Sequence, residues 1–192
     1  MSNQVTSGAS GSCCGPTCCK SEPIFKSEAA FVEFQVRAAI ESDRDGVSAL
    51  LSASKLATLD PFSQFGSQYV VANDSKGRLV GVAGLEVYGD DALLRSVAVA
   101  PSFRSQGLGR QLTQDRLRWA AEHDVSTVYL LTTDASSYWR RHGFSEIGRE
   151  EAPSSIRSTS QWSGGCSASA IAMKKQVGDE GKVPSGERGM QP

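Results

Sequence analysis

The chain has 192 residues, a formal net charge of −1 and a sequence pI of about 6.1. This charge balance excludes the strongly basic surface that binds nucleic acid or anionic membranes, so we expect neither as a partner. No run of about 18 apolar residues is present, which argues against a membrane-spanning helix. The polar N-terminus also lacks the apolar core of a secretory signal.

The two ends of the chain are predicted to be flexible. Residues 1–31 are rich in Ser, Gly, Thr and Cys, so they bury too little apolar surface to offset their ordering entropy. Residues 176–192 are charged and contain Gly and Pro, which is typical of a disordered tail. We therefore predict a Cys-rich arm over 1–31, one domain over 32–175 and a disordered tail over 176–192.

Four cysteines lie close together in the arm, at Cys13, Cys14, Cys18 and Cys19, and Cys166 stands alone. This is not a disulfide framework, so we expect a reducing, cytoplasmic compartment. Thiolates are soft ligands for zinc, cuprous copper or trivalent arsenic, which makes the four clustered cysteines a candidate metal or metalloid site. The alternative is a flexible tail with redox-sensitive thiols and no partner.

The first half of the domain is predicted to contain one helix and three strands. The strands are expected over residues 34–40, 68–72 and 79–88, and the helix over residues 43–54. The helix carries Val47, Leu50 and Leu51 at helical spacing, after Ser42 or Asp43 as its N-cap. A turn signal at residues 73–77 makes the second and third strands a hairpin.

The second half of the domain continues the alternation. Strands are expected over 92–100 and 127–133, from Gly143 onward, and over 168–173, with helices over 107–123 and 136–141. In the longer helix Leu108, Leu112 and Trp119 form one buried stripe. This order predicts an α/β fold in which helices flank a mixed sheet.

The most informative motif, Arg104-Ser105-Gln106-Gly107-Leu108-Gly109, lies between an apolar strand and a helix. Small residues let the backbone approach a ligand closely, and the first N–H groups of a helix have no hydrogen-bond acceptor within the helix. Together with the helix dipole they form an anion site suited to a pyrophosphate. Arg104 and Arg110 can add charge-assisted contacts.

Two glycines before a helix also fit a plain strand-to-helix turn. A dinucleotide fingerprint fits poorly, because Leu112 stands where its third glycine would fall. A Walker loop fits worse, since no Gly-Lys-Ser/Thr follows.

With its context, the motif resembles the pyrophosphate loop of the GNAT superfamily of N-acetyltransferases, Gln/Arg-x-x-Gly-x-Gly/Ala. Arg104, Gly107 and Gly109 match its three defining positions, and residues 138–144 are similar to the superfamily's Phe-Tyr-x-x-x-Gly-Phe segment. The resemblance covers about residues 35–175. It implies an acyl-CoA N-acyltransferase fold with a splayed central sheet, acetyl-CoA as co-substrate, and a homodimer.

The same resemblance assigns two sets of acetyl-CoA contacts. Backbone groups of Val97 and Val99 would pair with the pantetheine arm. The pyrophosphate would be bound by Arg104, Ser105, Gln106, Gly107, Leu108, Gly109 and Arg110.

A narrower resemblance links the chain to the arsenic-resistance N-acetyltransferases. It rests on residues 84–89, 92–96, 129–133 and 152–157, the last being a candidate loop over the acceptor site. This branch implies that the acceptor is the α-amine of an arsenic-containing amino acid. It also names Thr133 and Arg157 as substrate-binding candidates.

Acetyl transfer to an amine requires deprotonation of the amine, stabilisation of the thioester oxygen and protonation of the leaving thiolate. Glu86 is the candidate base, because its apolar strand would desolvate it; the alternative is a solvent-facing carboxylate. The superfamily's tyrosine acid is replaced by Trp139, so either Tyr138 or water would protonate the thiolate.

Arg95 interrupts an apolar strand, which is costly unless its charge is paired. Strand alternation places it on the same face as Val97 and Val99. It is a candidate to bind a substrate carboxylate bidentately. The alternative is a buried ion pair with Glu86 or Asp91.

Together these features predict an acetyltransferase that moves acetyl from acetyl-CoA to a small amine and is linked to arsenic resistance. Two other functions stay open. One is a metalloid-binding protein with a non-catalytic acyl-CoA fold, and the other is a protein N-acetyltransferase.

Overall fold

The computed structural model describes residues 34–57, 64–165, 167 and 169–177. They include a seven-stranded sheet with the order β1-β2-β3-β4-β5-β7-β6. The strands are β1 (Gln35–Ala38), β2 (Tyr69–Asn73), β3 (Leu79–Tyr88), β4 (Asp91–Val99), β5 (Thr127–Thr132), β6 (Ser145–Ile147) and β7 (Ile171–Gln176). The helices are α1 (Arg44–Ala53), α2 (Leu108–Glu122), α3 (Ser136–Arg141) and α4 (Ser154–Arg157), with a π-turn at Gln161–Gly165.

These elements confirm the predicted mixed sheet flanked by helices. The predicted bounds of the last strand were wrong by three residues: β7 covers residues 171–176, whereas the sequence predicted 168–173. The predicted Cys-rich arm, Cys166 and the end of the tail lie outside the described residues.

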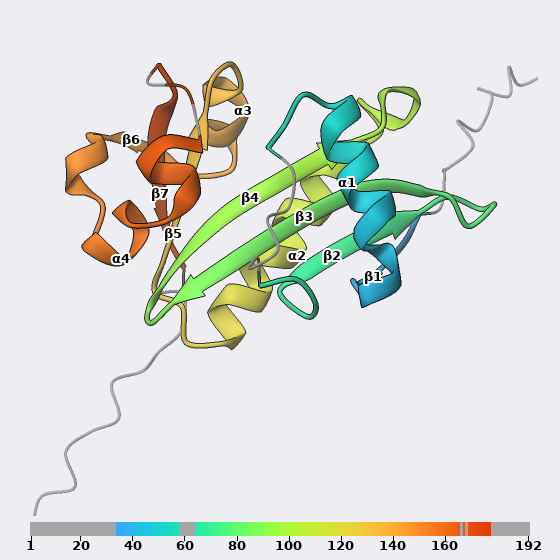
Figure 1. The fold of residues 1–192 in the computed structure, drawn as a ribbon, viewed down its shortest axis with the longest axis horizontal. Helices are drawn as coiled ribbons and strands as arrows, with labels where there is room; N and C mark the ends of the chain where they lie inside the picture. The colour runs from blue at the N-terminus through green and yellow to red at the C-terminus, as the bar shows by residue number, and fades with distance from the viewer. Residues whose placement is uncertain (1–33, 58–63, 166, 168, 178–192) are drawn as a thin grey trace, which may run out of the picture. The chain divides into compact units, whose positions relative to one another are not determined.

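The sheet opens between its two central strands. β4 and β5 are parallel and pair only over Asp91–Leu93 and Thr127–Tyr129, whereas the other neighbouring strands pair antiparallel. Beyond Leu93 the two strands diverge, and Figure 1 shows β5, β6 and β7 turned away from β4. The sheet is therefore splayed at the carboxyl ends of β4 and β5, as the family resemblance implies.

The helices cover both faces of the sheet. Leu108 and Leu112 of α2 pack on Val70 and Ala72 of β2, and Trp139 of α3 joins a core cluster on the same face. On the opposite face, α1 packs on Val71 and Val82 of the sheet, and Ile156 of α4 packs on Leu93. Figure 1 shows α1 in front of β3 and α2 behind it.

A β-bulge in β4 corrects the predicted direction of Arg95. Val82 pairs with Ala98 but Gly84 pairs with Arg95, so two β4 residues stand opposite one β3 residue. The extra residue reverses the alternation: Val97 packs on the α2 side, while Arg95 shares the other face with Glu86. Arg95 therefore does not share a face with Val97 and Val99.

The start of α1 is held to β1 by an ion pair that the sequence did not predict. The Arg37 guanidinium donates two hydrogen bonds to Asp43, at 2.7 and 2.8 Å, and Asp43 also accepts from the Ile40 N–H. Asp43 is the N-cap of α1, as expected, but its side chain caps the preceding 3₁₀ turn instead. The hydrogen bonds from Arg37 hold the pKa of Asp43 below its ordinary value.

This ion pair predicts a pH effect on stability. Because the pKa of Asp43 is lower in the folded than in the unfolded chain, its contribution is present at neutral pH and lost as pH falls through the folded pKa. Arg37 is partly exposed, so we expect about 1 kcal/mol. Urea unfolding at pH 7 and pH 3 should show a smaller acid loss in Asp43→Asn than in wild type. An equal acid loss in both proteins would contradict this assignment.

Candidate active site

A cavity of about 350 Å³ lies where β4 and β5 diverge. Its wall comes from the end of α1, the diverging halves of both strands, α3 and the segment after α4. The lining residues are Lys55, Leu56, Ala57, Leu94, Arg95, Ser96, Val97, Leu130, Leu131, Thr132, Thr133, Asp134, Ala135, Trp139, Gln161, Ser167 and Ala170. This volume suits a small-molecule ligand.

The loop before α2 has the backbone of an anion-binding turn. Ser105 and Gly107 have φ angles of +62° and +83°, and Gly107 is the N-cap of α2. The first intrahelical bond there runs from the Gln111 N–H to the Gly107 carbonyl, at 3.0 Å. The N–H groups of Leu108, Gly109 and Arg110 therefore precede any intrahelical acceptor, as an anion at a helix N-terminus requires.

Side chains of the loop brace it against the end of β4. Arg104 donates from Nε to the Val99 carbonyl at 2.9 Å, and Gln106 donates to the Ser102 carbonyl at 3.0 Å. A Cβ at Gly109 would lie 3.4 Å from the Tyr138 hydroxyl and 3.7 Å from Val99 Cγ2. The start of α2 therefore sits directly against β4 and α3.

The Gly107 conformation carries a testable cost. An L-residue in the left-handed region is strained by about 1–2 kcal/mol, so Gly107→Ala should lose about that much stability. The displaced N–H groups should also raise KM for acetyl-CoA about tenfold, because charge-assisted contacts to a pyrophosphate are lost. Gly109→Ala is the matched control for stability, since its Cβ meets only ordinary van der Waals contacts. An unchanged melting temperature and KM in Gly107→Ala would contradict the role given to this turn.

The backbone of β4 beyond the bulge is oriented toward the splay. The Ala100 N–H donates to the Val80 carbonyl of β3 at 2.8 Å, so the groups of the preceding Val99 point to the β5 side. The Val99 carbonyl accepts from Arg104 there. Val97 lines the cavity. The contacts of both valines with a pantetheine arm stay a prediction.

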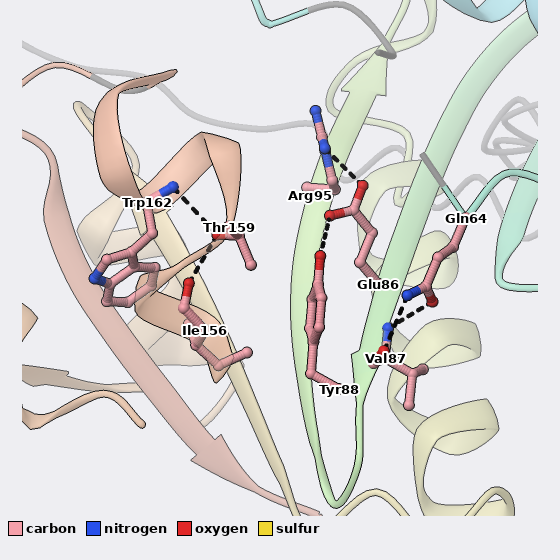
Figure 2. A network of polar contacts seen from close by, with 8 residues as sticks. All are labelled: Gln64, Glu86, Val87, Tyr88, Arg95, Ile156, Thr159 and Trp162. Carbon is pink, nitrogen blue, oxygen red and sulfur yellow. Dashed lines mark hydrogen bonds and ion pairs between the residues drawn. The ribbon is translucent and has the colours of Figure 1, made fainter. Parts of the chain in front are cut away.

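A buried polar network joins Arg95 of the cavity wall to Glu86 and Tyr88 (Figure 2). Arg95 Nη1 donates to Glu86 Oε1 at 2.6 Å, and the side chains are only 3% and 6% exposed. The Tyr88 hydroxyl donates to Glu86 Oε2 at 3.0 Å. Figure 2 shows Glu86 between Arg95 and Tyr88. Arg95 lines the cavity, and Glu86 binds the Arg95 guanidinium. The ion pair with Glu86, which the sequence analysis gave as an alternative for Arg95, is therefore formed.

The aromatic pair of α3 points in two directions. Trp139 is buried and lines the cavity. Tyr138 directs its hydroxyl toward α2, where it lies 3.4 Å from Thr113 Oγ1. Thr113 Oγ1 itself donates to the Gly109 carbonyl at 2.9 Å, which leaves Tyr138 as the donor of this pair. Tyr138 therefore sits beside the anion-binding loop, and the cavity is walled by the tryptophan.

Of the other substrate candidates, Thr133 lines the cavity and Arg157 is not among its lining residues. Six polar residues of the wall were missed by sequence analysis as site residues: Lys55, Ser96, Thr132, Asp134, Gln161 and Ser167. Lys55 follows α1, and Gln161 begins the π-turn, so neither belongs to a motif. Ser96 lies inside a predicted strand, and only the bulge distinguishes it from its neighbours.

The clustered cysteines proposed as a metal site lie outside the described residues. Within the part of the chain that is described, no group of three or more His, Cys, Asp or Glu side chains is placed to hold a metal ion. In the same part, no helix combines the length and apolarity needed to cross a membrane.

Comparisons with known proteins identify the family and the fold of this chain. The sequence model of the acetyltransferase (GNAT) domain family matches residues 65–146, which include β3, β4, the loop at residues 104–109 and α2. The chain belongs to the GNAT acetyltransferase family. An uncharacterized N-acetyltransferase of Chlorobaculum tepidum is 34% identical over 84 residues, which cover 43% of this chain and 54% of that protein. An amino-acid acetyltransferase of Mycobacterium tuberculosis is 33% identical over 75 residues, 38% of this chain and 42% of that protein.

A Bacillus subtilis protein of uncharacterized function is 30% identical over 105 residues, covering 54% of this chain and 70% of its own length. The structure of Neisseria gonorrhoeae N-acetylglutamate synthase, complexed with coenzyme A and N-acetyl-glutamate, has a TM-score of 0.64 at 19% identity. The match covers 76% of this chain and 35% of that one. The predicted fold and the predicted family are confirmed, and the family assignment supports the predicted enzyme class and acetyl-CoA co-substrate. This chain spans about half or less of the first two relatives.

Proposed function

We propose that this chain transfers an acetyl group from acetyl-CoA to the α-amine of a small amino acid. The observation that carries the proposal is a guanidinium, Arg95, in the wall of a cavity at the splay of a GNAT sheet. A planar guanidinium binds a carboxylate bidentately, which would fix an α-amino acid with its amine close to its carboxylate anchor. Similarity to an amino-acid acetyltransferase supports this class of acceptor.

Glu86 and Tyr88 are proposed to orient the guanidinium of Arg95. A guanidinium has five N–H donors, and one of the outer nitrogens is bonded to Glu86 at 2.6 Å. With Glu86 in turn bonded by Tyr88, the chain of contacts fixes the side-chain torsions of Arg95 before a substrate binds. Such preorganisation lowers the entropy cost of binding. Thr133, on the same wall, is proposed to contact the acceptor, and Arg157 to contribute only if α4 moves.

The roles of Glu86 and Tyr138 are distinguishable by kinetics. A base lost in Glu86→Gln would lower kcat and remove the acid limb of the pH–rate profile. If Glu86 instead only orients Arg95, the same variant would raise KM for the acceptor and leave the pH–rate profile unchanged. We favour the role of Glu86 in orienting Arg95, because both oxygens of the Glu86 carboxylate already accept hydrogen bonds. Tyr138, the candidate acid, is proposed to contact the donor, since its hydroxyl lies beside the loop that starts α2.

The finer acceptor that we propose is an arsenic-containing amino acid, and the support for it is the resemblance of four segments to arsenic-resistance N-acetyltransferases. An α-amino acid bearing arsenic offers the same carboxylate and amine to Arg95 as any other. We also propose action in the cytoplasm, supported by the cysteine pattern, and a homodimeric state, supported by the resemblance to the superfamily.

The test measures CoA release by the full chain and by a version lacking residues 1–31. The acceptor panel pairs arsenic-containing amino acids with common amino acids and with the corresponding amines that lack a carboxylate. We expect turnover with amino acids in both proteins and at least tenfold lower kcat/KM for the decarboxylated amines. Equal activity on amines with and without the carboxylate would overturn the role of Arg95. The absence of turnover, with tight arsenite binding lost on truncation, would instead support sequestration by the arm, which the family assignment does not favour.

A further inference from the structure

Ser96 combines three unusual features in one residue. Its φ angle is +57°, a left-handed value that favours glycine and that is uncommon for serine. Its Oγ is buried and has no hydrogen-bond partner among the described residues. It also lines the cavity, between Arg95 and Val97. Strain and an unsatisfied polar group each reduce stability, and such features persist where function requires them.

The position of Ser96 along β4 is the junction of the two substrate sites. Arg95 on its N-terminal side is the proposed anchor of the acceptor. Val97 on its C-terminal side belongs to the backbone that faces the donor. The bulge turns these neighbours to opposite faces of the sheet, so that Ser96 is the residue between them. Because Oγ is buried, its contact with a molecule in the adjoining cavity requires rotation to another staggered rotamer.

We infer that the Ser96 hydroxyl relays the proton of the reaction, an inference that rests on the proposed acetyl transfer to an amine. In that transfer the acceptor nitrogen bonds to the acetyl carbon, and the bond from this carbon to sulfur breaks. The nitrogen then carries one proton too many and the departing sulfur carries a negative charge. Ser96 Oγ accepts the proton from nitrogen while its own proton passes to sulfur, so the serine ends unchanged and the products are a neutral amide and a thiol.

The surrounding residues make this relay more suitable than a separate acid and base. A serine hydroxyl donates and accepts at once, whereas Glu86 is held by Arg95 and Tyr88. Trp139 stands on the cavity wall where the family resemblance expects a tyrosine, and indole N–H is a donor only. Tyr138 turns its hydroxyl toward Thr113 of α2. Thr132, Thr133 and Ser167 also bring hydroxyls to the wall, but among these residues Ser96 is the one on β4 directly after Arg95.

The decisive variants are Ser96→Ala and Ser96→Gly, with Ser54→Ala as the matched control. The Ser54 Oγ is also buried without a partner among the described residues, but Ser54 does not line the cavity. Single-turnover acetyl transfer should fall about 100-fold in both Ser96 variants, the usual contribution of a proton-transfer group. Affinity for acetyl-CoA, measured by calorimetry, should be unchanged. Ser54→Ala should transfer acetyl at the wild-type rate.

Two further readouts separate a relay from a structural role. Ser96→Gly should melt at a higher temperature than Ser96→Ala, because glycine relieves the left-handed strain, and yet be equally inactive. Rates in mixtures of H2O and D2O should curve in wild type, where two protons move together, and become linear in Ser96→Ala.

The relay is overturned if Ser96→Ala retains transfer within about threefold of wild type. It is also overturned if the variant loses activity only together with acetyl-CoA binding or melting temperature. A wild-type chain that binds acetyl-CoA but acetylates no amine overturns the proposed function, and the relay with it.

Discussion

Glu86→Ala is expected to lower the free energy of unfolding by about 3–5 kcal/mol, since it removes the Glu86 carboxylate from a buried ion pair with Arg95. Arg95 and Glu86 are 3% and 6% exposed, so water cannot replace the lost partner. The Tyr88 hydroxyl loses its acceptor in the same substitution. Urea unfolding monitored by tryptophan fluorescence measures the loss.

Two controls define the source of this effect. Glu146→Ala breaks the exposed pair with Arg140, whose side chains are 55% and 40% exposed, and should cost at most about 1 kcal/mol. Combining Glu86→Leu with Arg95→Met should restore most of the stability, because apolar replacement of both partners removes the buried charge. Although its stability is restored, the double variant should not favour amino acids over amines lacking a carboxylate, because it has no Arg95 guanidinium. Equal stabilities of Glu86→Ala and Glu146→Ala would contradict the burial of this pair.

Gly84→Ala is expected to lose about 3 kcal/mol of stability through overpacking. Gly84 pairs with Tyr69 across β2 and β3, and a Cβ there would overlap the Tyr69 ring, which is fully buried. Gly84 also stands opposite Arg95 in the β3–β4 register. Displacement of the ring should therefore disturb the face that carries Arg95, and raise KM for the acceptor along with the loss of stability.

Gly81→Ala is the matched comparison, because Gly81 lies on the same strand and is also buried. Its Cβ would lie 2.9 Å from Leu112 Cδ1 and 3.2 Å from Leu108 Cδ2, both at the far ends of flexible side chains. The expected cost is about 1 kcal/mol, since these methyl groups can shift. Thermal unfolding of both variants tests the ranking. A smaller loss in Gly84→Ala than in Gly81→Ala would show that the Tyr69 ring is free to move.

The donor half of the site follows largely from local sequence. A strand, Pro101, the Arg104–Gly109 motif and an amphipathic helix form one contiguous segment, so their chemistry is visible without the fold. The structure gives this segment the backbone that the motif requires, with Ser105 and Gly107 in the left-handed region. Most strands and helices were likewise predictable, because their apolar periodicity is a local property.

The cavity, in contrast, depends on contacts between distant segments. Lys55, Gln161 and Ser96 reach the same cavity from α1, the π-turn and β4, and no local pattern links them. The prediction for the Arg95 face was wrong because strand alternation holds only without a bulge, and the extra residue at Ser96–Val97 is defined by pairing with β3.

The sequence by itself determined the family and the order of elements, and it predicted a loop for an anionic donor, because each rests on residues adjacent in the chain. Only the tertiary structure decided that Glu86 is bound to Arg95 and Tyr88 and that Ser96 lies at the splay. These features arise from strand register and burial, which depend on how segments pair across the sheet.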